Sequence, residues 1–123
     1  MKQLSLLAVV GILGGVAACT GPTKQEWMTK FETVLTDRLC GPDFIYVHCF
    51  EIDQAACRTL VAPIAHTCVT KIADQLPDHM DEELGRKYGG IAGQCVGDEV
   101  GPKLESKIRQ PIDPKCQDPS AWH

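Results

Sequence analysis

Six of the seven cysteines lie beyond residue 39, and their thiols could form disulfides, bind a metal ion or exchange disulfides with a substrate. No two of them form a C-x-x-C pair, and none has the Cys/His spacing of a zinc site, so the pattern disfavours metal and redox chemistry. An even number of cysteines in a small exported domain predicts disulfides instead. The predicted disulfide cysteines are Cys40, Cys49, Cys57, Cys68, Cys95 and Cys116.

The spacing of these cysteines argues against one pairing and leaves the others open. Cys57 and Cys68 are separated by eleven residues on one expected helix, which places them roughly 16 Å apart at 1.5 Å per residue. A disulfide needs Cα atoms within about 7 Å, so these two are not expected to pair unless Pro63 folds the segment back. The remaining connectivity stays open among the 15 pairings that six cysteines allow.

The histidines do not form an obvious catalytic set. Catalysis by a histidine needs a second group within hydrogen-bond reach. His48 adjoins Cys49, but an even number of cysteines leaves no obvious free thiol for such a pair. His66 is expected on the solvent side of its helix. His79 lies close to several acidic residues, and together they could bind a metal ion weakly. The group is better explained as the solvated start of a helix, where acidic side chains interact favourably with the helix dipole. We therefore predict no metal, no cofactor and no enzymatic activity.

Glycine recurs at every fourth position from residue 85, at Gly85, Gly89, Gly93, Gly97 and Gly101. Each glycine inside a helix costs about 1 kcal/mol relative to alanine, so this spacing needs a compensating gain. The sequence allows two interpretations. The row packs tightly against another helix of the same domain, or its first four members line a groove for the helix or strand of a partner protein.

Residues 1–18 have the three parts of an export signal: Lys2 near the start, an apolar run over 4–16, and small residues before Cys19. The apolar run is shorter than the about 20 residues that a membrane span needs. Val16-Ala17-Ala18-Cys19 resembles the lipobox of bacterial lipoproteins. This resemblance implies cleavage before Cys19, a diacylglyceryl group on its thiol and an acylated amino terminus.

The lipoprotein resemblance also implies a location. Thr20 rather than an aspartate follows Cys19, which in Gram-negative lipoproteins implies the outer membrane, with the protein facing the periplasm. Residues 19–22 would then form a lipidated tether. Several acyl chains, at about 0.8 kcal/mol per buried CH₂, make a durable attachment. Contact with the membrane is expected to run through this lipid.

Length and charge describe the part of the chain beyond the tether. Residues 23–123 are expected to form a single domain, because about 100 residues support one core. Without Lys2, the mature chain has 11 basic and 16 acidic residues, a net charge of −5. Nucleic-acid binding needs a clustered basic surface, so this charge argues against nucleic acid as a partner.

Helical periodicity begins directly after the tether. Thr23 and Glu26 form a capping box for a first helix, which Gly41-Pro42 ends. Residues 44–47 are too few to show a periodicity and are expected to form an extended or irregular connection. The apolar residues at helical spacing in the first helix are Trp27, Phe31, Val34 and Leu35.

Two further helices are predicted from caps and apolar stripes. Asp53 caps a helix that runs to about Gln75, and Pro63 is expected to kink or split it. Asp78 is expected to cap the next helix, which Gly101-Pro102 bounds. The inward stripe of this last helix comprises Met80, Leu84, Tyr88, Ile91, Cys95 and Val96.

The C-terminal region is expected to be mostly irregular. Residues 103–109 form a predicted short helix, and three later prolines make the tail irregular. Cys116 is expected to tie this tail to the body. Trp122 has two interpretations: it docks onto the body near Cys116, or it is an exposed residue that contacts a partner.

These patterns predict an all-α protein, a small three- to four-helix disulfide-stabilised domain with an irregular proline-rich C-terminal tail. The predicted function is that of a periplasmic, non-enzymatic module that binds another protein. In size, helical content and anchor the chain is similar in outline to the pilotins that escort secretin subunits to the outer membrane, although no motif carries this similarity. The alternative is an immunity or inhibitor lipoprotein that neutralises a periplasmic toxin or lytic enzyme, with residues 78–83 entering the active site.

Overall fold

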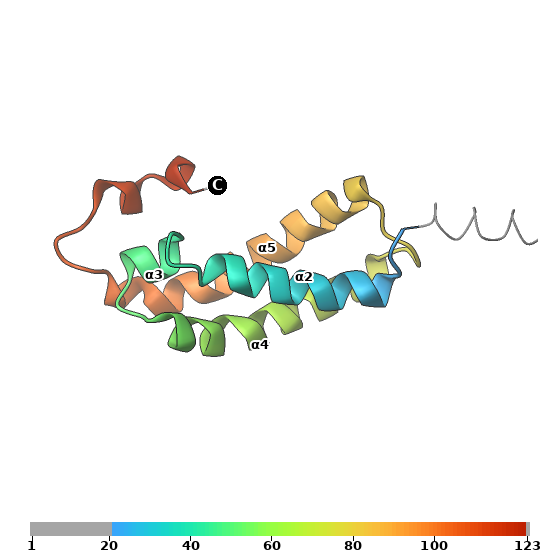
Figure 1. Ribbon diagram of the computed structural model, residues 1–123, viewed down its shortest axis with the longest axis horizontal. Coiled ribbons are helices and arrows are strands. Elements are labelled where there is room, and N and C mark those ends of the chain that lie inside the picture. The colour runs from blue at the N-terminus through green and yellow to red at the C-terminus, as the bar shows by residue number, and fades with distance from the viewer. Residues whose placement is uncertain (1–20, 123) are drawn as a thin grey trace, which may run out of the picture.

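The computed structural model describes residues 21–122, so the predicted export signal over 1–18 and the lipidated Cys19 lie outside the described residues. The helices are α2 (Lys24–Leu39), α3 (Ile45–Cys49), α4 (Gln54–Ile72) and α5 (Glu82–Leu104), followed by short 3-10 turns (Figure 1). The described part of the chain contains isolated bridges but no β-strand. The predicted all-α fold is confirmed.

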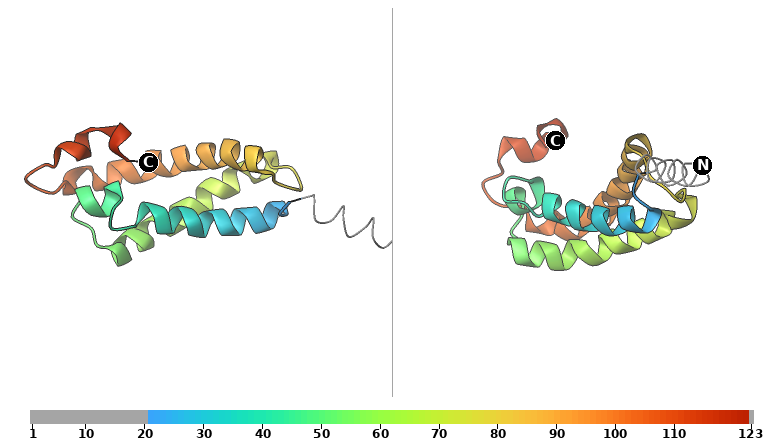
Figure 2. Two further views of the ribbon diagram at one scale, coloured as in Figure 1. Left: turned by 45° about the horizontal axis from the view of Figure 1, so that its top comes forward. Right: turned by 45° about the vertical axis from the view of Figure 1, so that its right-hand side comes forward.

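α4 packs against both α2 and α5, and the three helices form an elongated bundle (Figures 1 and 2). One part of the core joins Val61 and Ala65 of α4 to Val96 and Val100 of α5, all of them fully buried. The other part comprises Val69, Ile72, Leu76, Met80 and Ala92, and Trp27 and Phe31 of α2 pack against it. Among residues 21–122, no helix has the length and apolar character that a membrane span requires.

The first two predicted caps are confirmed. Thr23 Oγ1 accepts a hydrogen bond from the backbone N–H of Glu26 at 3.2 Å. Asp53 Oδ1 accepts one from the N–H of Ala56 at 2.7 Å. These side chains satisfy donors that the first turn of a helix leaves without an intrahelical partner. α4 continues through Pro63 as a single element, so the helix is not split there.

The predicted cap of the last long helix is wrong. Asp81, not Asp78, is the N-cap of α5, and its Oδ1 accepts from the N–H of Leu84 at 2.8 Å. Residue 78 is held by the start of α2 instead: its carbonyl accepts from the N–H of Lys24, and the N–H of Met80 donates to the carbonyl of Pro22, both at 2.9 Å. This pairing with a distant segment keeps residues 78–80 extended, and α5 begins after them.

The predicted boundary at Gly101-Pro102 is also wrong, because α5 runs through both residues to Leu104. Proline inside a helix removes one backbone hydrogen bond and crowds the preceding turn. Val100 and Leu104, four residues apart on one face, are both buried in the core, and their burial offsets that cost. The expected helix over 103–109 is reduced to a 3-10 turn over Glu105–Lys107. Ile91, assigned to the inward stripe, is 43% exposed.

The connection over 44–47 is helical rather than extended or irregular. It forms most of α3, whose first turn is closed by a hydrogen bond from the N–H of His48 to the carbonyl of Phe44 at 3.1 Å. Tyr46 packs into the core, and Cys49 is cross-linked to the tail. An element of this length has no detectable hydrophobic period, and contacts with distant parts of the chain decide its conformation.

Candidate functional site

All six cysteines of the described body form disulfides, so the predicted framework is confirmed. Cys40–Cys57 joins the end of α2 to α4, with Cα atoms 5.6 Å apart, and Cys68–Cys95 joins α4 to α5 at 5.8 Å. Cys49–Cys116 joins α3 to the tail at 5.7 Å. Cys57 and Cys68 have different partners, as their separation on one helix predicts. None of these six sulfurs is a free thiol that could attack a substrate.

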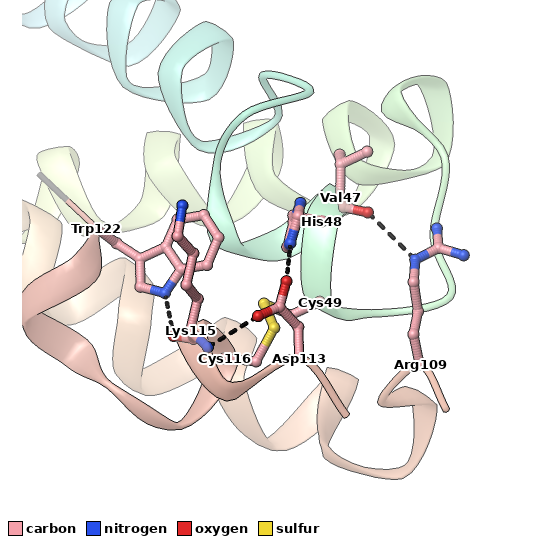
Figure 3. Close-up of polar contacts among 8 residues, drawn as sticks. All are labelled: Val47, His48, Cys49, Arg109, Asp113, Lys115, Cys116 and Trp122. Atoms are coloured by element: carbon pink, nitrogen blue, oxygen red, sulfur yellow. Dashed lines mark hydrogen bonds and ion pairs between the residues drawn. A yellow bond between two sulfur atoms is a disulfide. The ribbon is translucent and has the colours of Figure 1, made fainter. Parts of the chain in front are cut away.

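His48 binds a carboxylate rather than a thiol. Its Nε2 lies 2.8 Å from Oδ2 of Asp113, which is 65 positions further along the chain (Figure 3). The neighbouring Cys49 is bonded to Cys116. The thiol–imidazole pair that the sequence allows is therefore not assembled, and His48 instead helps to hold the tail against α3.

Trp122 docks beside the same disulfide. Its Nε1 donates to the carbonyl of Lys115 at 2.8 Å (Figure 3). The indole ring lies against His48, with ring centroids 5.3 Å apart, and edge-on to Phe44 at 6.3 Å. Of the two interpretations of Trp122, docking near Cys116 is confirmed.

The lowered pKa of the Asp113 carboxyl predicts that docking of the tail depends on pH. The hydrogen bond from His48, followed by the one from the backbone N–H of Lys115, holds the pKa of Asp113 below its ordinary value of 3.8. A carboxyl with a lowered pKa favours the docked state above the pKa of the undocked group, and that preference is lost as pH falls through the docked pKa. His48 on α3 and Lys115 in the tail are the groups that face it.

In a Trp27→Phe background, which leaves Trp122 as the only tryptophan, we expect the fluorescence of Trp122 to shift to longer wavelength as the solution is acidified through the range where Asp113 takes up its proton. The physical reason is that the protonated carboxyl no longer favours the contact with His48, and the indole moves into water. Asp113→Asn is the control, because it should show the shifted spectrum already at neutral pH. An identical spectrum for both proteins at neutral pH would contradict this role of Asp113.

The other two histidines among residues 21–122, His66 and His79, have structural positions. His66 is exposed, with 70% of its side chain accessible, and its Nδ1 lies 3.0 Å from Oε1 of Glu32, so the expected exposure is confirmed. His79 is exposed but pairs with Thr23 in an isolated antiparallel bridge, outside the helix start. Among residues 21–122, no group of three or more His, Cys, Asp or Glu side chains is placed to hold a metal ion.

The glycine row divides into two parts. A Cβ at Gly85 would lie 3.2 Å from Nε1 of Trp27, and one at Gly89 would lie 3.1 Å from Cε2 of Phe31. Gly93, Gly97 and Gly101 have no neighbouring atom within 4 Å of such a Cβ. A step of four residues turns about 400° around a helix, so each glycine is rotated by about 40° from the last. The row drifts away from α2 and does not form one straight groove.

We expect Gly97→Ala to raise the free energy of unfolding by about 1 kcal/mol, because alanine restricts the unfolded chain and favours the helix. The midpoint of thermal unfolding should rise by roughly 4–8 °C. Gly89→Ala is the matched comparison: its Cβ would press against Phe31, so it should give a smaller gain or a loss. Equal gains at both positions, measured by thermal melts, would show that the α2 contact does not require glycine.

An apolar surface is exposed on α2. We define the α2 face as Pro22, Glu26, Trp27, Lys30, Phe31 and Val34, which line a hollow of about 430 Å³. Trp27 and Phe31 stack with ring centroids 4.9 Å apart and planes inclined by 13°. Val34 is 52% exposed, the highest exposed fraction among the large apolar side chains of the described chain. A second, mainly apolar hollow continues past Lys30 and Val34 toward Thr29 and Thr33.

Sequence periodicity did not single out the α2 face. Val34 and Leu35 both fit the apolar pattern of the first helix, yet neighbouring residues point about 100° apart on a helix. Leu35 packs against the core while Val34 faces solvent. To bury one face, a helix needs only one of these two neighbouring positions to be apolar. The second apolar residue is the signal that could have revealed this surface.

Fold and contacts define a small all-α domain that disulfides cross-link at both ends of its central helix α4. The chain belongs to the NttA family, whose model carries the description "T2SS substrate NttA" and matches residues 22–107. The match includes α2 to α5 and stops before the tail that holds Cys116. No curated protein and no solved structure matches the chain.

Proposed function

We propose that this chain is an exported substrate of type II secretion that acts without catalysis. In this proposal a lipid on Cys19 holds it at a membrane, and the body docks through its α2 face. The NttA family, with its description as a T2SS substrate, supports the export route. The disulfides support it as well, because such bonds form and persist in oxidising compartments, among them the bacterial periplasm.

The exposed α2 face is the observation that carries the docking role. It is a mainly apolar surface that also includes Glu26 and Lys30, whereas the side chains that most often perform chemistry have structural partners in the described chain. The cysteines are cross-linked, and His48 and His66 contact carboxylates. Such a body offers a surface for binding rather than a site for converting a substrate. Action without catalysis is compatible with an accessory protein, of which a pilotin-like protein is one form.

The anchor and the export route can be tested together in cells. The full-length chain with a C-terminal epitope is expressed in a bacterium with a working type II system and in a strain that lacks it. We expect the wild-type chain to incorporate labelled palmitate and to sediment with membranes, and Cys19→Ser to do neither. Protease added to intact cells should reach the wild-type chain only in the strain with the working system.

Each arm of this experiment can fail on its own. A wild-type chain without label, found in the soluble fraction like Cys19→Ser, would overturn the lipid anchor and leave the export route standing. Equal protease access in the two strains would overturn the export route and leave the anchor standing. A protein that stays shielded on the periplasmic side of the outer membrane in both strains would match the location that Thr20 implies.

A further inference from the structure

We propose that the α2 face lies against the lipid bilayer that holds the acyl chains of Cys19, so that the domain rests on the membrane along α2. This inference rests on the proposed function, because it takes the lipid anchor as given and identifies what the α2 face docks on. The occupant is the interface of a lipid bilayer, and neither a second copy of this chain nor another protein.

The position of the tether is the first reason. Pro22 belongs to the α2 face and is the last residue of the proposed tether. The chain from residue 19 to residue 22 spans at most about 10 Å, at 3.3–3.6 Å per residue. A lipidated Cys19 therefore keeps Pro22, two residues before α2, within about 10 Å of the lipidated residue. That end of the body lies opposite the C-terminal tail along the long axis (Figure 1).

The chemistry of the α2 face is the second reason. A stacked tryptophan–phenylalanine pair and a half-exposed valine form one contiguous apolar surface. Tryptophan is enriched where membrane and water meet, because its ring is large and amphipathic. The charged members of the face, Glu26 and Lys30, have opposite signs. The net negative charge of the mature chain is therefore not concentrated here, where it would repel anionic lipids.

Other exposed apolar residues do not form a comparable surface. Ile91 is 43% exposed and Ile112 is 38% exposed, and neither lines any of the hollows that border the α2 face. Single apolar residues of this kind are common on soluble domains and need no partner. Ile91 is therefore a matched control for Val34, with similar size, β-branching and exposure but a position on α5.

The anchor and the face have separate roles in this arrangement. The acyl chains supply the attachment, since burial of each CH₂ adds to it. A short tether keeps the α2 face close to the bilayer and so raises its effective concentration there. Even a face with weak affinity for lipid then stays in contact with the bilayer. The face thus sets the orientation of the domain, with the long axis of α2 along the bilayer rather than perpendicular to it.

The experiment uses the mature chain, residues 19–123, made without lipid and coupled through the Cys19 thiol to a maleimide lipid. The other six cysteines are in disulfides and do not compete for coupling. The vesicles are phosphatidylcholine with brominated acyl chains, which quench a tryptophan that reaches the bilayer interface. Trp122→Phe leaves Trp27 as the only emitter, since the chain has two tryptophans.

We expect vesicle coupling to quench Trp27, Val34→Asp to abolish most of that quenching, and Ile91→Asp to leave it unchanged. Val34→Thr, which keeps the shape of the side chain, is the second variant and should show an intermediate loss. Circular dichroism is recorded on the same sample of each variant, which separates a loss of folding from a loss of contact with the bilayer. Because Val34 is exposed, its replacement should leave the fold intact.

Three results would overturn the proposal. The first is absence of quenching in the coupled protein, and the second is equal quenching with Val34→Asp, which indicates an upright domain. The third is a dimer in sedimentation without vesicles that Val34→Asp dissolves, which assigns the face to a second copy. Because the coupling is chemical, these outcomes do not depend on whether cells lipidate Cys19. Failure of the docking and failure of the lipid anchor are thus distinguishable.

Discussion

Reduction of the three disulfides is expected to unfold the domain under conditions in which the oxidised protein is fully folded. The bonds close segments with sequence separations of 17, 27 and 67 residues. Each closure contributes on the order of 2–4 kcal/mol, chiefly by restricting the unfolded chain. A typical domain has a net stability of about 5–15 kcal/mol, so the three bonds together are comparable with the whole. Far-UV circular dichroism with and without a thiol reductant measures the loss of helix.

The individual bonds should contribute unequally. Cys68→Ala/Cys95→Ala removes a cross-link within the core and should cost about 3–4 kcal/mol, which lowers the melting midpoint by roughly 12–32 °C. Cys49→Ala/Cys116→Ala opens the longest loop, yet it frees a tail that lies outside both parts of the core. Because that tail gains freedom in the folded state as well, we expect a smaller shift. A larger shift for the tail bond, or a reduced chain that still melts cooperatively, would contradict this account.

Local signals in the sequence predicted the parts of the fold that local interactions decide. The caps at Thr23 and Asp53 act on donors within their own first turn, so neighbouring residues determine them. The cysteine framework followed from an even number of thiols and from a geometric limit on Cys57 and Cys68. The connectivity did not follow, because it depends on how α2, α4 and α5 meet in space.

The incorrect predictions share one physical cause, which is that distant contacts outweigh local preferences. Asp78 is a good helix cap by type, but its carbonyl pairs with Lys24, so Asp81 caps the helix instead. A proline such as Pro102 often marks a helix boundary, but the burial of Leu104 in the core keeps α5 helical past it. Residues 45–49 have no periodicity of their own, and the tail that fastens them lies more than 60 residues away.

The candidate site was predictable only in part. The spacing of the glycines located the row on one helix, but it could not predict that Gly85 and Gly89 approach Trp27 and Phe31 while Gly93 and Gly97 face open space, because this depends on how α2 and α5 meet. The pair His48–Asp113 could not be foreseen, since nothing local connects the two residues. The α2 face left one signal in the sequence, which is that Val34 is a second apolar residue beside Leu35. The exposure of Val34 could not be predicted, because it depends on how α2 is rotated about its axis against α4.

Leu104→Ala is expected to lower the free energy of unfolding by about 2–5 kcal/mol and the melting midpoint by roughly 8–40 °C. Leu104 is 1% exposed and packs in the same part of the core as Val100 and Val61. Its replacement removes apolar contacts and leaves a cavity that the cross-linked helices cannot easily close. It also removes the burial that keeps α5 helical past Pro102, so the last turn should fray.

The matched control for this loss is Val34→Ala. Val34 is 52% exposed, so truncating it in free protein should change the stability by no more than about 0.5 kcal/mol. Thermal melts of both variants, together with amide hydrogen exchange over residues 101–104, separate the two positions. Exchange at these amides should accelerate in Leu104→Ala and stay unchanged in Val34→Ala. If Leu104→Ala melts like the wild type with protected amides, the continuation of α5 through Pro102 is held by local helix propensity alone, and the argument from burial is wrong.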